Sequence, residues 1–582
     1  MQYIKDHNIC YIFDPFDYLG PKRRKLLEQS WAGLFRKYLL EELPVDKVAK
    51  HFHASMGRPT KELYTALGTL VLQQLHDLSD SEVVSTLPFD TRWHYALDIT
   101  KESDEDKTIA ERTLREYRKI VIEEKLDGYL FETLTDKLIE TCEVDTSKQR
   151  MDSSHIRSNM RRLGRISLFA NTIKKFLVNL KRQHRDIFDA EISKEVASRY
   201  LKKEESGCFS QVKPSETKKT LKMVSEDLLI LIEKFKNHQG ISRLNSFHLL
   251  KRVLADQCTV SNQEEKDQKV EVKPPGEVAC DSLQNPSDPD ATYDGHKGQG
   301  YQVQIMETFT PDKERDQTKP NLITYVEVEP AHKSDTEALI PAIKETQERS
   351  CAPKELEADA LYGSDENVQA AEELGVKVNA PVIGKKTSKL GLADFSFHED
   401  RSQIKACPQG QEPKKQWRSK KGLFITLFLS EHCQNCSHKK QCPVQEGKAG
   451  TYLRYSAKQL RLARRRLYGN TQEFQDRYRW RAGIEGTNSH LKSDIGAGHL
   501  RVRGLPAVTY CVTLKALALN ILRASSARKA GIEAKNSFDK EILGRVLGFF
   551  TLKGYFVFLA RHIIDLLTRF NLSKNICFQL AG

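Results

Sequence analysis

The first 140 residues carry their hydrophobic side chains at helical spacing. A Gly-Arg-Pro-Thr start signal at 57–60 precedes a run in which apolar residues recur every three or four positions: Leu63, Leu67, Leu70, Val71 and Leu75. Ser79 and Glu82 are spaced as in a capping box and predict a second helix, from Glu82 to about Leu87. We therefore expect an all-α domain over residues 1–100, which is either a helix-turn-helix or a helical packing unit.

A basic stretch over residues 160–257 also predicts helices. Its apolar positions alternate between spacings of three and four residues, which suits a helical hairpin or a short coiled coil: Leu221, Val224, Leu228, Leu231 and Phe235. Residues 259–280 are rich in Glu, Lys, Gln and Pro and predict a solvated linker. We expect residues 160–280 to form a helical insertion.

Strand-like segments flank this insertion. The first predicted strand covers residues 148–157, and the later elements are strands at 300–305 and 321–328, a helix at 335–348, a strand at 355–361, a helix at 365–374 and a strand at 376–383. This order predicts a mixed α/β sheet in which acidic residues at the strand ends can meet.

The C-terminal half divides into three further segments. Residues 384–455 suggest a strand-rich insertion that carries cysteines, and residues 456–525 return to the α/β core with a charged helix. Residues 526–582 predict an apolar helical tail of unknown role. With residues 101–383 as the first part of the core, the chain has the length of roughly three or four domains.

The net charge of the chain indicates which class of partner it binds. The 582 residues carry a net charge of +13 and a sequence pI near 9.0, which favours a polyanion such as DNA. The N-terminal segment lacks the basic and apolar regions of a signal peptide, and we find no run of 18 uncharged apolar residues, so we expect no membrane span. Twelve cysteines are too few for a disulfide scaffold, and a cytoplasmic, nucleoid-associated protein with reduced thiols is the expectation.

Residues 478–492 (YRWRAGIEGTNSHLK) place four polar groups on one face of a predicted helix. At about 100° per residue, with Tyr478 at the origin, Arg481, Glu485 and Lys492 all fall within about 60° of it. An ordinary surface helix with Arg481 and Glu485 as an i,i+4 ion pair is the alternative interpretation.

The spacing Tyr478-x2-Arg481-x3-Glu485-x6-Lys492 resembles the YREK signature of bacterial insertion-sequence transposases of the DDE class. Residues 57–97 (GRPTKELYTALGTLVLQQLHDLSDSEVVSTLPFDTRWHYAL) resemble, nearly end to end, the N-terminal region of the same transposases, which is implicated in recognising transposon ends. Residues 498–525 resemble their closing helix. The resemblance implies an RNase H-like catalytic core behind an all-α domain, with helical and Cys-bearing insertions.

The resemblance also implies three catalytic carboxylates. Asp152, in the first predicted strand, and Asp359, in the segment ADALYGS, resemble the two aspartates of the family, and Glu485 supplies the third acid. Asp145 is a rival for the first position, although a lone Asp is more often a turn or cap residue. The three acids would bind two Mg²⁺ (or Mn²⁺) ions about 4 Å apart.

On this interpretation the partner is double-stranded DNA, both transposon ends and target, bound by a homodimer on paired ends. Tyr478, Arg481 and Lys492 would contact phosphates. The expected reaction is metal-dependent strand cleavage followed by strand transfer. Two alternatives remain: an RNase H-like nuclease that cuts without joining, and a catalytically inert DNA-binding protein derived from a transposon.

Four cysteines of the strand-rich insertion suggest a second metal. Cys433-x2-Cys436-x5-Cys442 has one pair spaced as in a zinc knuckle, and Cys407 can supply a fourth thiolate to a structural Zn²⁺. The alternative is four free, reduced thiols.

Overall fold

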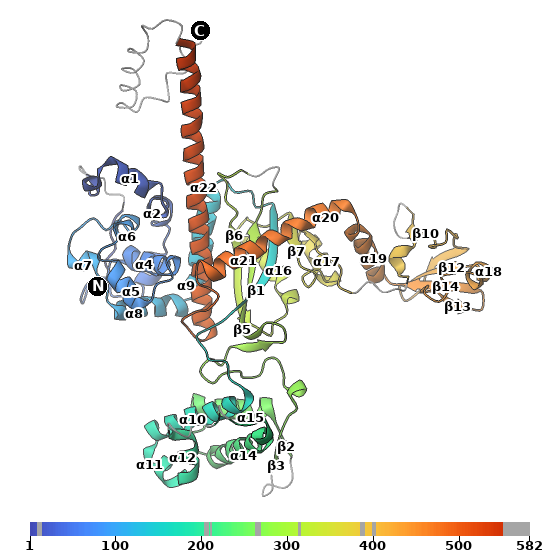
Figure 1. Cartoon of the computed structure of the whole chain (residues 1–582), viewed down its shortest axis with the longest axis horizontal. Coiled ribbons are helices and arrows are strands. Elements are labelled where there is room, and N and C mark those ends of the chain that lie inside the picture. The colour runs from blue at the N-terminus through green and yellow to red at the C-terminus, as the bar shows by residue number, and fades with distance from the viewer. Residues whose placement is uncertain are drawn as a thin grey trace.

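The computed structural model describes residues 1–7, 14–202, 209, 212–261, 269–311, 316–384, 390–398 and 403–550, with side chains described as far as Lys535. Residues 551–582 of the predicted tail lie outside the described residues. The chain forms a central body from which two modules project in different directions (Figure 1).

A mixed sheet lies at the centre of the body, as the strand pattern predicts. Its strand order is β6-β5-β1-β7-β8, and a short strand, β4, pairs with the start of β5. The neighbours β1 and β5 are antiparallel, as are β5 and β6, whereas β1, β7 and β8 are parallel. The bounds are β1 Lys148–Ile156, β4 Thr292–Asp294, β5 Gly298–Thr308, β6 Ile323–Pro330, β7 Glu355–Ala358 and β8 Lys377–Asn379.

Helices cover both faces of this sheet. On one face, α16 (Leu339–Glu348) and α17 (Asp365–Glu373) bury Met151 of β1 and Met306 of β5. On the other face, the apolar residues of β5 and β6 share a core with α22 (Leu505–Phe550) and with the N-terminal helices. Because side chains alternate along a strand, Met151 and Asp152 point to opposite faces, and Asp152 lies on the α22 side.

The N-terminal region is helical, as predicted. Ser79 and Glu82 form the expected capping box, although the helix begins at Asp80, two residues before the predicted start. The helices continue past residue 100 and share one core with the central body. Their bounds are α1 Gly20–Glu28, α2 Trp31–Leu34, α3 Val45–Ala49, α4 Leu63–Leu75, α5 Asp80–Thr86, α6 Thr91–Ala96, α7 Asp104–Lys107, α8 Glu111–Glu123 and α9 Leu126–Thr141.

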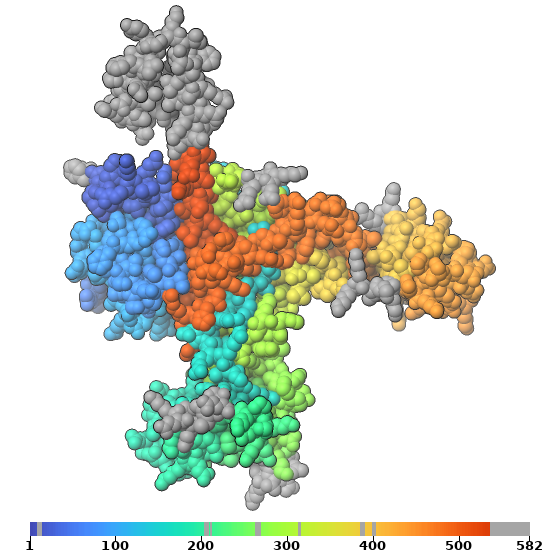
Figure 2. Space-filling model, viewed as in Figure 1, coloured from blue at the N-terminus to red at the C-terminus, as the bar shows by residue number. Residues whose placement is uncertain are grey.

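The helical insertion has a hydrophobic core of its own and lies below the central body in Figures 1 and 2. It is a bundle rather than a hairpin or coiled coil, because α14 packs against both α10 and α15. The predicted linker at 259–280 is wrong in part, since β2 (Cys258–Ser261) and β3 (Lys269–Val272) pair as antiparallel strands. The helices are α10 Arg165–Gln183, α11 Arg185–Glu191, α12 Lys194–Leu201, α14 Thr217–Phe235 and α15 Asn245–Gln257.

The Cys-bearing module projects to the right of the body (Figure 2) and is strand-rich, as predicted. A four-stranded sheet of order β11-β12-β14-β13 lies beside a two-stranded one, β9-β10. The bounds are β9 Ser396–Phe397, β10 Ile404–Ala406, β11 Lys415–Arg418, β12 Phe424–Phe428, α18 Ser430–Gln434, β13 Gln445–Gly447 and β14 Gly450–Tyr455. The helix α19 (Ala457–Gly469) leads back to the sheet.

One helical segment in the described part of the chain, Leu505–Lys535, is long and apolar enough to cross a membrane by length and composition. In its most apolar stretch, 72% is buried inside the protein. The segment belongs to α22, which packs against α9, α4 and β6. This burial is what a core helix requires, so the segment carries no argument for a membrane.

Candidate active site

Two carboxylates meet where β1 and β7 run side by side. The parallel register pairs Met151 with Ala358, so Asp152 and Asp359 follow at the same level of the sheet. β7 ends at Ala358, whereas β1 continues to Ile156 along β5. The sheet therefore brings together two acids that lie far apart in the sequence, as the order of predicted strands implies.

A tight turn takes the chain away from β7 directly after Asp359. The Tyr362 N–H donates to the Asp359 carbonyl, and the Gly363 N–H donates to the Ala360 carbonyl. Only glycine fits at 363, because a Cβ there would lie 2.6 Å from the Ala380 Cβ and 2.9 Å from Arg465 Nη2. The predicted strand at 355–361 is thus three residues too long, and Asp359 lies in the turn.

Burial and nearby charges both act on the Asp152 carboxyl. Burial is the main cause that raises its pKa to about 6, and the negative charges of Asp359 and Asp335 contribute to that rise. The Arg481 guanidinium and the Ser153 N–H act in the opposite direction. A cation placed between neighbouring carboxylates stabilises them as anions.

The segment that carries Glu485 is not the single helix predicted over residues 478–492. α20 (Gln472–Tyr478) passes into a 3₁₀ turn, η9 (Arg479–Ala482), and α21 (Gly483–Ser493) follows. The tighter turn allows the Arg150 guanidinium to approach: Arg150 Nη1 donates to the Trp480 carbonyl at 2.8 Å. A Cβ at 483 would lie 2.0 Å from that nitrogen, so Gly483 is required for this contact.

A buried ionic cluster fixes α21 against the sheet. Glu307 of β5 is fully enclosed and accepts hydrogen bonds from Arg150 (2.7 Å), Thr487 (2.6 Å) and Arg523 (2.9 Å). These three donors lie on β1, α21 and α22. Glu307 therefore joins the strand of Asp152 to the helix of Glu485, which sequence reasoning missed because a lone Glu in a strand has no distinguishing spacing.

Arg481 bridges two of the predicted acids. Its Nη1 lies 3.7 Å from Asp152 Oδ2, and its Nη2 lies 3.3 Å from Glu485 Oε1. Its guanidinium carbon stands 5.8 Å from the centroid of the Tyr478 ring. The i,i+4 pair with Glu485 exists, as the alternative interpretation expects, but Arg481 also faces the sheet and so links α21 to Asp152.

The other polar residues of α21 differ in exposure. The Glu485 side chain is 66% exposed, so it stands at the rim of the site. Asn488 is buried and its Nδ2 lies 3.5 Å from Asp152 Oδ2. Burial lowers the pKa of Lys492, and the nearby Asp152 opposes that shift. The predicted residues thus gather around Asp152, with Glu485 the most peripheral.

Asp335 adds a fourth carboxylate that the sequence did not indicate. It begins the 3₁₀ turn η7 (Asp335–Glu337) and accepts hydrogen bonds from Ser153 (3.0 Å) and Gln304 (2.9 Å). The sequence signal is only a Ser-Asp-Thr-Glu helix start, which is typical of capping. Asp145, the rival of Asp152, is a turn residue whose carboxylate accepts from the Ser147 N–H at 2.9 Å.

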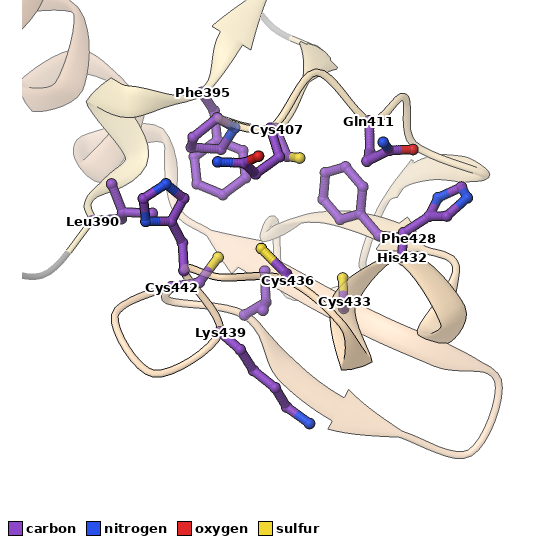
Figure 3. Close-up of a pocket in the computed structure, with 14 residues that line it drawn as sticks. Leu390, Phe395, Cys407, Gln411, Phe428, His432, Cys433, Cys436, Lys439 and Cys442 are labelled. Atoms are coloured by element: carbon purple, nitrogen blue, oxygen red, sulfur yellow. The ribbon is translucent and has the colours of Figure 1, made fainter.

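The four cysteines of the module line one cavity of about 40 Å³. Figure 3 shows the thiols of Cys407, Cys436 and Cys442 directed into it, with Cys433 beside them. Burial raises the pKa of Cys433 and Cys442, and the neighbouring thiols contribute to both shifts. Cys407, the member most distant in sequence, reaches the cavity because a turn at 407–410 faces α18.

The described residues contain no group of three or more His, Cys, Asp or Glu side chains already arranged to hold a metal ion. This holds for the carboxylates around Asp152 and for the four thiols. In both places the donor atoms suit the predicted metal, oxygen for Mg²⁺ and sulfur for Zn²⁺.

Comparison with known proteins matches two parts of the chain. Residues 406–524 match a family model described as a transposase DDE domain, and residues 31–119 match one described as a transposase domain of the DUF772 type. No curated protein and no solved structure matches. The two matches support an insertion-sequence transposase. The first includes Glu485 but begins after Asp152 and Asp359.

Proposed function

We propose that the protein is a DNA transposase of an insertion sequence, which binds terminal inverted repeats and catalyses strand cleavage and strand transfer. The observation that carries this proposal is the placement of Asp152 and Asp359 at one level of the sheet, with Glu485 on a helix anchored to the adjacent strand β5. The order of strands and helices supports an RNase H-like core.

Asp152, Asp359 and Glu485 are the residues that would hold two Mg²⁺ (or Mn²⁺) ions. The exposed Glu485 has the freedom to turn toward Asp152, and Arg481 can leave it for a DNA phosphate. When bound, such ions activate water or a 3′-hydroxyl and stabilise the leaving oxygen.

The remaining polar residues orient the DNA. Arg481 presents a planar guanidinium suited to a phosphate, and the Tyr478 ring supports it from one side. Asn488 holds the Asp152 carboxylate in place. The N-terminal helices would recognise the end sequence, and a homodimer acting in the cytoplasm would pair two ends.

The test is a reaction on plasmid DNA that carries the sequences flanking this gene on both sides. We expect Mg²⁺-dependent cuts at inverted repeats and covalent joining of the cut ends to target DNA. Cuts without joined products would favour the RNase H-like nuclease. Binding without any cut would favour the inert DNA-binding protein.

We further propose a structural Zn²⁺ at Cys407, Cys433, Cys436 and Cys442. Among the described residues, the module core has six buried hydrophobic side chains, and modules of this size commonly need a metal or disulfide for stability. Four thiols around one cavity provide a tetrahedral sulfur set once their side chains rotate.

The zinc proposal predicts one Zn²⁺ per chain in protein purified without chelator. Replacing Cys436 by serine should remove the metal and lower the melting temperature of the module, because structural zinc contributes folding free energy. The matched control is Cys280→Ser, since Cys280 is exposed and lies outside the cluster. Elemental analysis showing no zinc in wild-type protein, or equal zinc in both variants, would exclude the site.

A further inference from the structure

Three cations lie near the C-terminal half of β1. They are Arg157 directly after β1, Lys297 in the turn between β4 and β5, and Lys492 near the end of α21. Among the described residues, none of the three forms an ion pair within 4 Å. Unpaired cations that repel one another raise the free energy of the folded chain unless an anion joins them.

Lys297 is held in place by its turn. The Asp294 carboxylate accepts from the N–H groups of His296 (2.8 Å) and Lys297 (2.5 Å). The Lys297 ammonium then donates to Ser153 Oγ at 3.1 Å, and Ser153 donates to Asp335. Because Ser153 follows Asp152 on β1, this chain of hydrogen bonds holds the ammonium at the next position of the strand that carries the proposed catalytic residue.

Arg157 and Lys492 are brought together by the loop that follows α21. The Arg157 N–H donates to the Gly498 carbonyl, and the Leu500 N–H donates to the Arg157 carbonyl at 2.8 Å. The Gly498 N–H in turn donates to the Lys492 carbonyl at 3.2 Å. Backbone pairing therefore fixes the end of β1 next to the end of α21.

The pKa of the His155 ring is affected by all three cations. His155 lies half-buried on β1, two residues before Arg157, and burial lowers the pKa of its ring to about 4. The positive charges of Lys492, Arg157 and Lys297 contribute to that lowering, and a hydrogen bond with the Gln299 backbone opposes it. All three cations therefore lie within electrostatic range of the His155 ring.

We propose that Arg157, Lys297 and Lys492 form a seat for one backbone phosphate of DNA, next to the phosphate that is cut at Asp152. The identity of the anion as DNA rests on the proposed function. The seat adds Arg157 and Lys297, neither of which belongs to the four-residue signature within residues 478–492. Backbone phosphate contacts of this kind position a strand without reading its sequence.

Lysine footprinting tests the seat in the full-length protein. Acetylation of each lysine is followed by mass spectrometry with and without a saturating 30-bp duplex of arbitrary sequence, in Ca²⁺ so that no cleavage is needed. We expect acetylation of Lys297 and Lys492 to fall by about fivefold or more, because a bound phosphate covers both ammonium groups. Lys222, exposed on α14, should change little. Unchanged acetylation of Lys297 would overturn the proposal.

Two further comparisons sharpen this test. Lys297→Ala should lower the salt slope of duplex binding by about one unit, whereas Lys222→Ala should leave it unchanged; equal slopes would contradict the seat. Inorganic phosphate at the same phosphate concentration should protect Lys297 far less than the duplex, and equal protection would reassign the seat to free phosphate. Absence of DNA cleavage by the wild type would overturn the proposed function. The lysine protection and the salt slopes would still be interpretable, because they are measured without cleavage.

Discussion

Replacing Asp152 by asparagine is expected to lower metal-dependent DNA cleavage by about 10³-fold or more, since it removes transition-state stabilisation worth several kcal/mol. Asparagine keeps the shape of the side chain, and the Asn488 contact can remain. Affinity for the DNA end should therefore stay within about twofold, because phosphate contacts dominate it. Cleavage rate and end affinity, measured on the same labelled duplex, separate the two effects.

Asp145→Asn is the matched control for this variant. Asp145 lies seven residues earlier and accepts a hydrogen bond from the Ser147 N–H within a turn. Its loss should leave cleavage close to the wild-type rate. Full activity of Asp152→Asn together with loss of activity in Asp145→Asn would transfer the first catalytic position to Asp145.

Replacing Glu307 by alanine should have the largest effect on stability. Removing one partner from a buried ionic cluster leaves the Arg150 and Arg523 charges without compensation, at a cost of about 3–5 kcal/mol. Cleavage should fall as well, because Glu307 holds α21 against the sheet through Thr487. Urea unfolding and the cleavage rate of the folded fraction measure the two consequences.

Glu116→Ala provides a control for charge removal alone. Glu116 pairs with Arg112 on an exposed face of α8, and such surface pairs contribute under about 1 kcal/mol. Equal unfolding free energies for Glu307→Ala and Glu116→Ala would mean that the buried cluster does not stabilise the body.

Local patterns in the sequence predict much of this fold. The alternation of apolar residues marks the central strands, and Ser79 with Glu82 marks a helix start to within two residues. The break at 479–482 escapes prediction, because it results from the contact of Arg150, more than 300 positions earlier, with the Trp480 carbonyl. The pairing of β2 with β3 is not predicted either, because the charged composition of that segment resembles that of a linker.

The candidate site was predictable where spacing carries information. Helical periodicity predicts one face for Tyr478, Arg481, Glu485 and Lys492. The helix is interrupted at 479–482, but Arg481 still contacts the Tyr478 ring and the Glu485 carboxylate. Asp335, Glu307 and Lys297 have no such spacing and approach the site only through strand pairing and turns. Arg461 and Arg465, which charge alone would assign to DNA, instead bind Asp365 and backbone carbonyls of the core.

Iron-directed cleavage of the protein tests most directly whether the three carboxylates form one metal centre. Fe²⁺ is added in place of Mg²⁺ to zinc-saturated protein, ascorbate and peroxide are supplied, and the backbone cuts are mapped by mass spectrometry. We predict cuts clustered near Asp152, Asp359 and Glu485, competed by Mg²⁺ and lost together in Asp152→Asn. Cuts that avoid one of these segments, or that persist unchanged in Asp152→Asn, would contradict a shared centre.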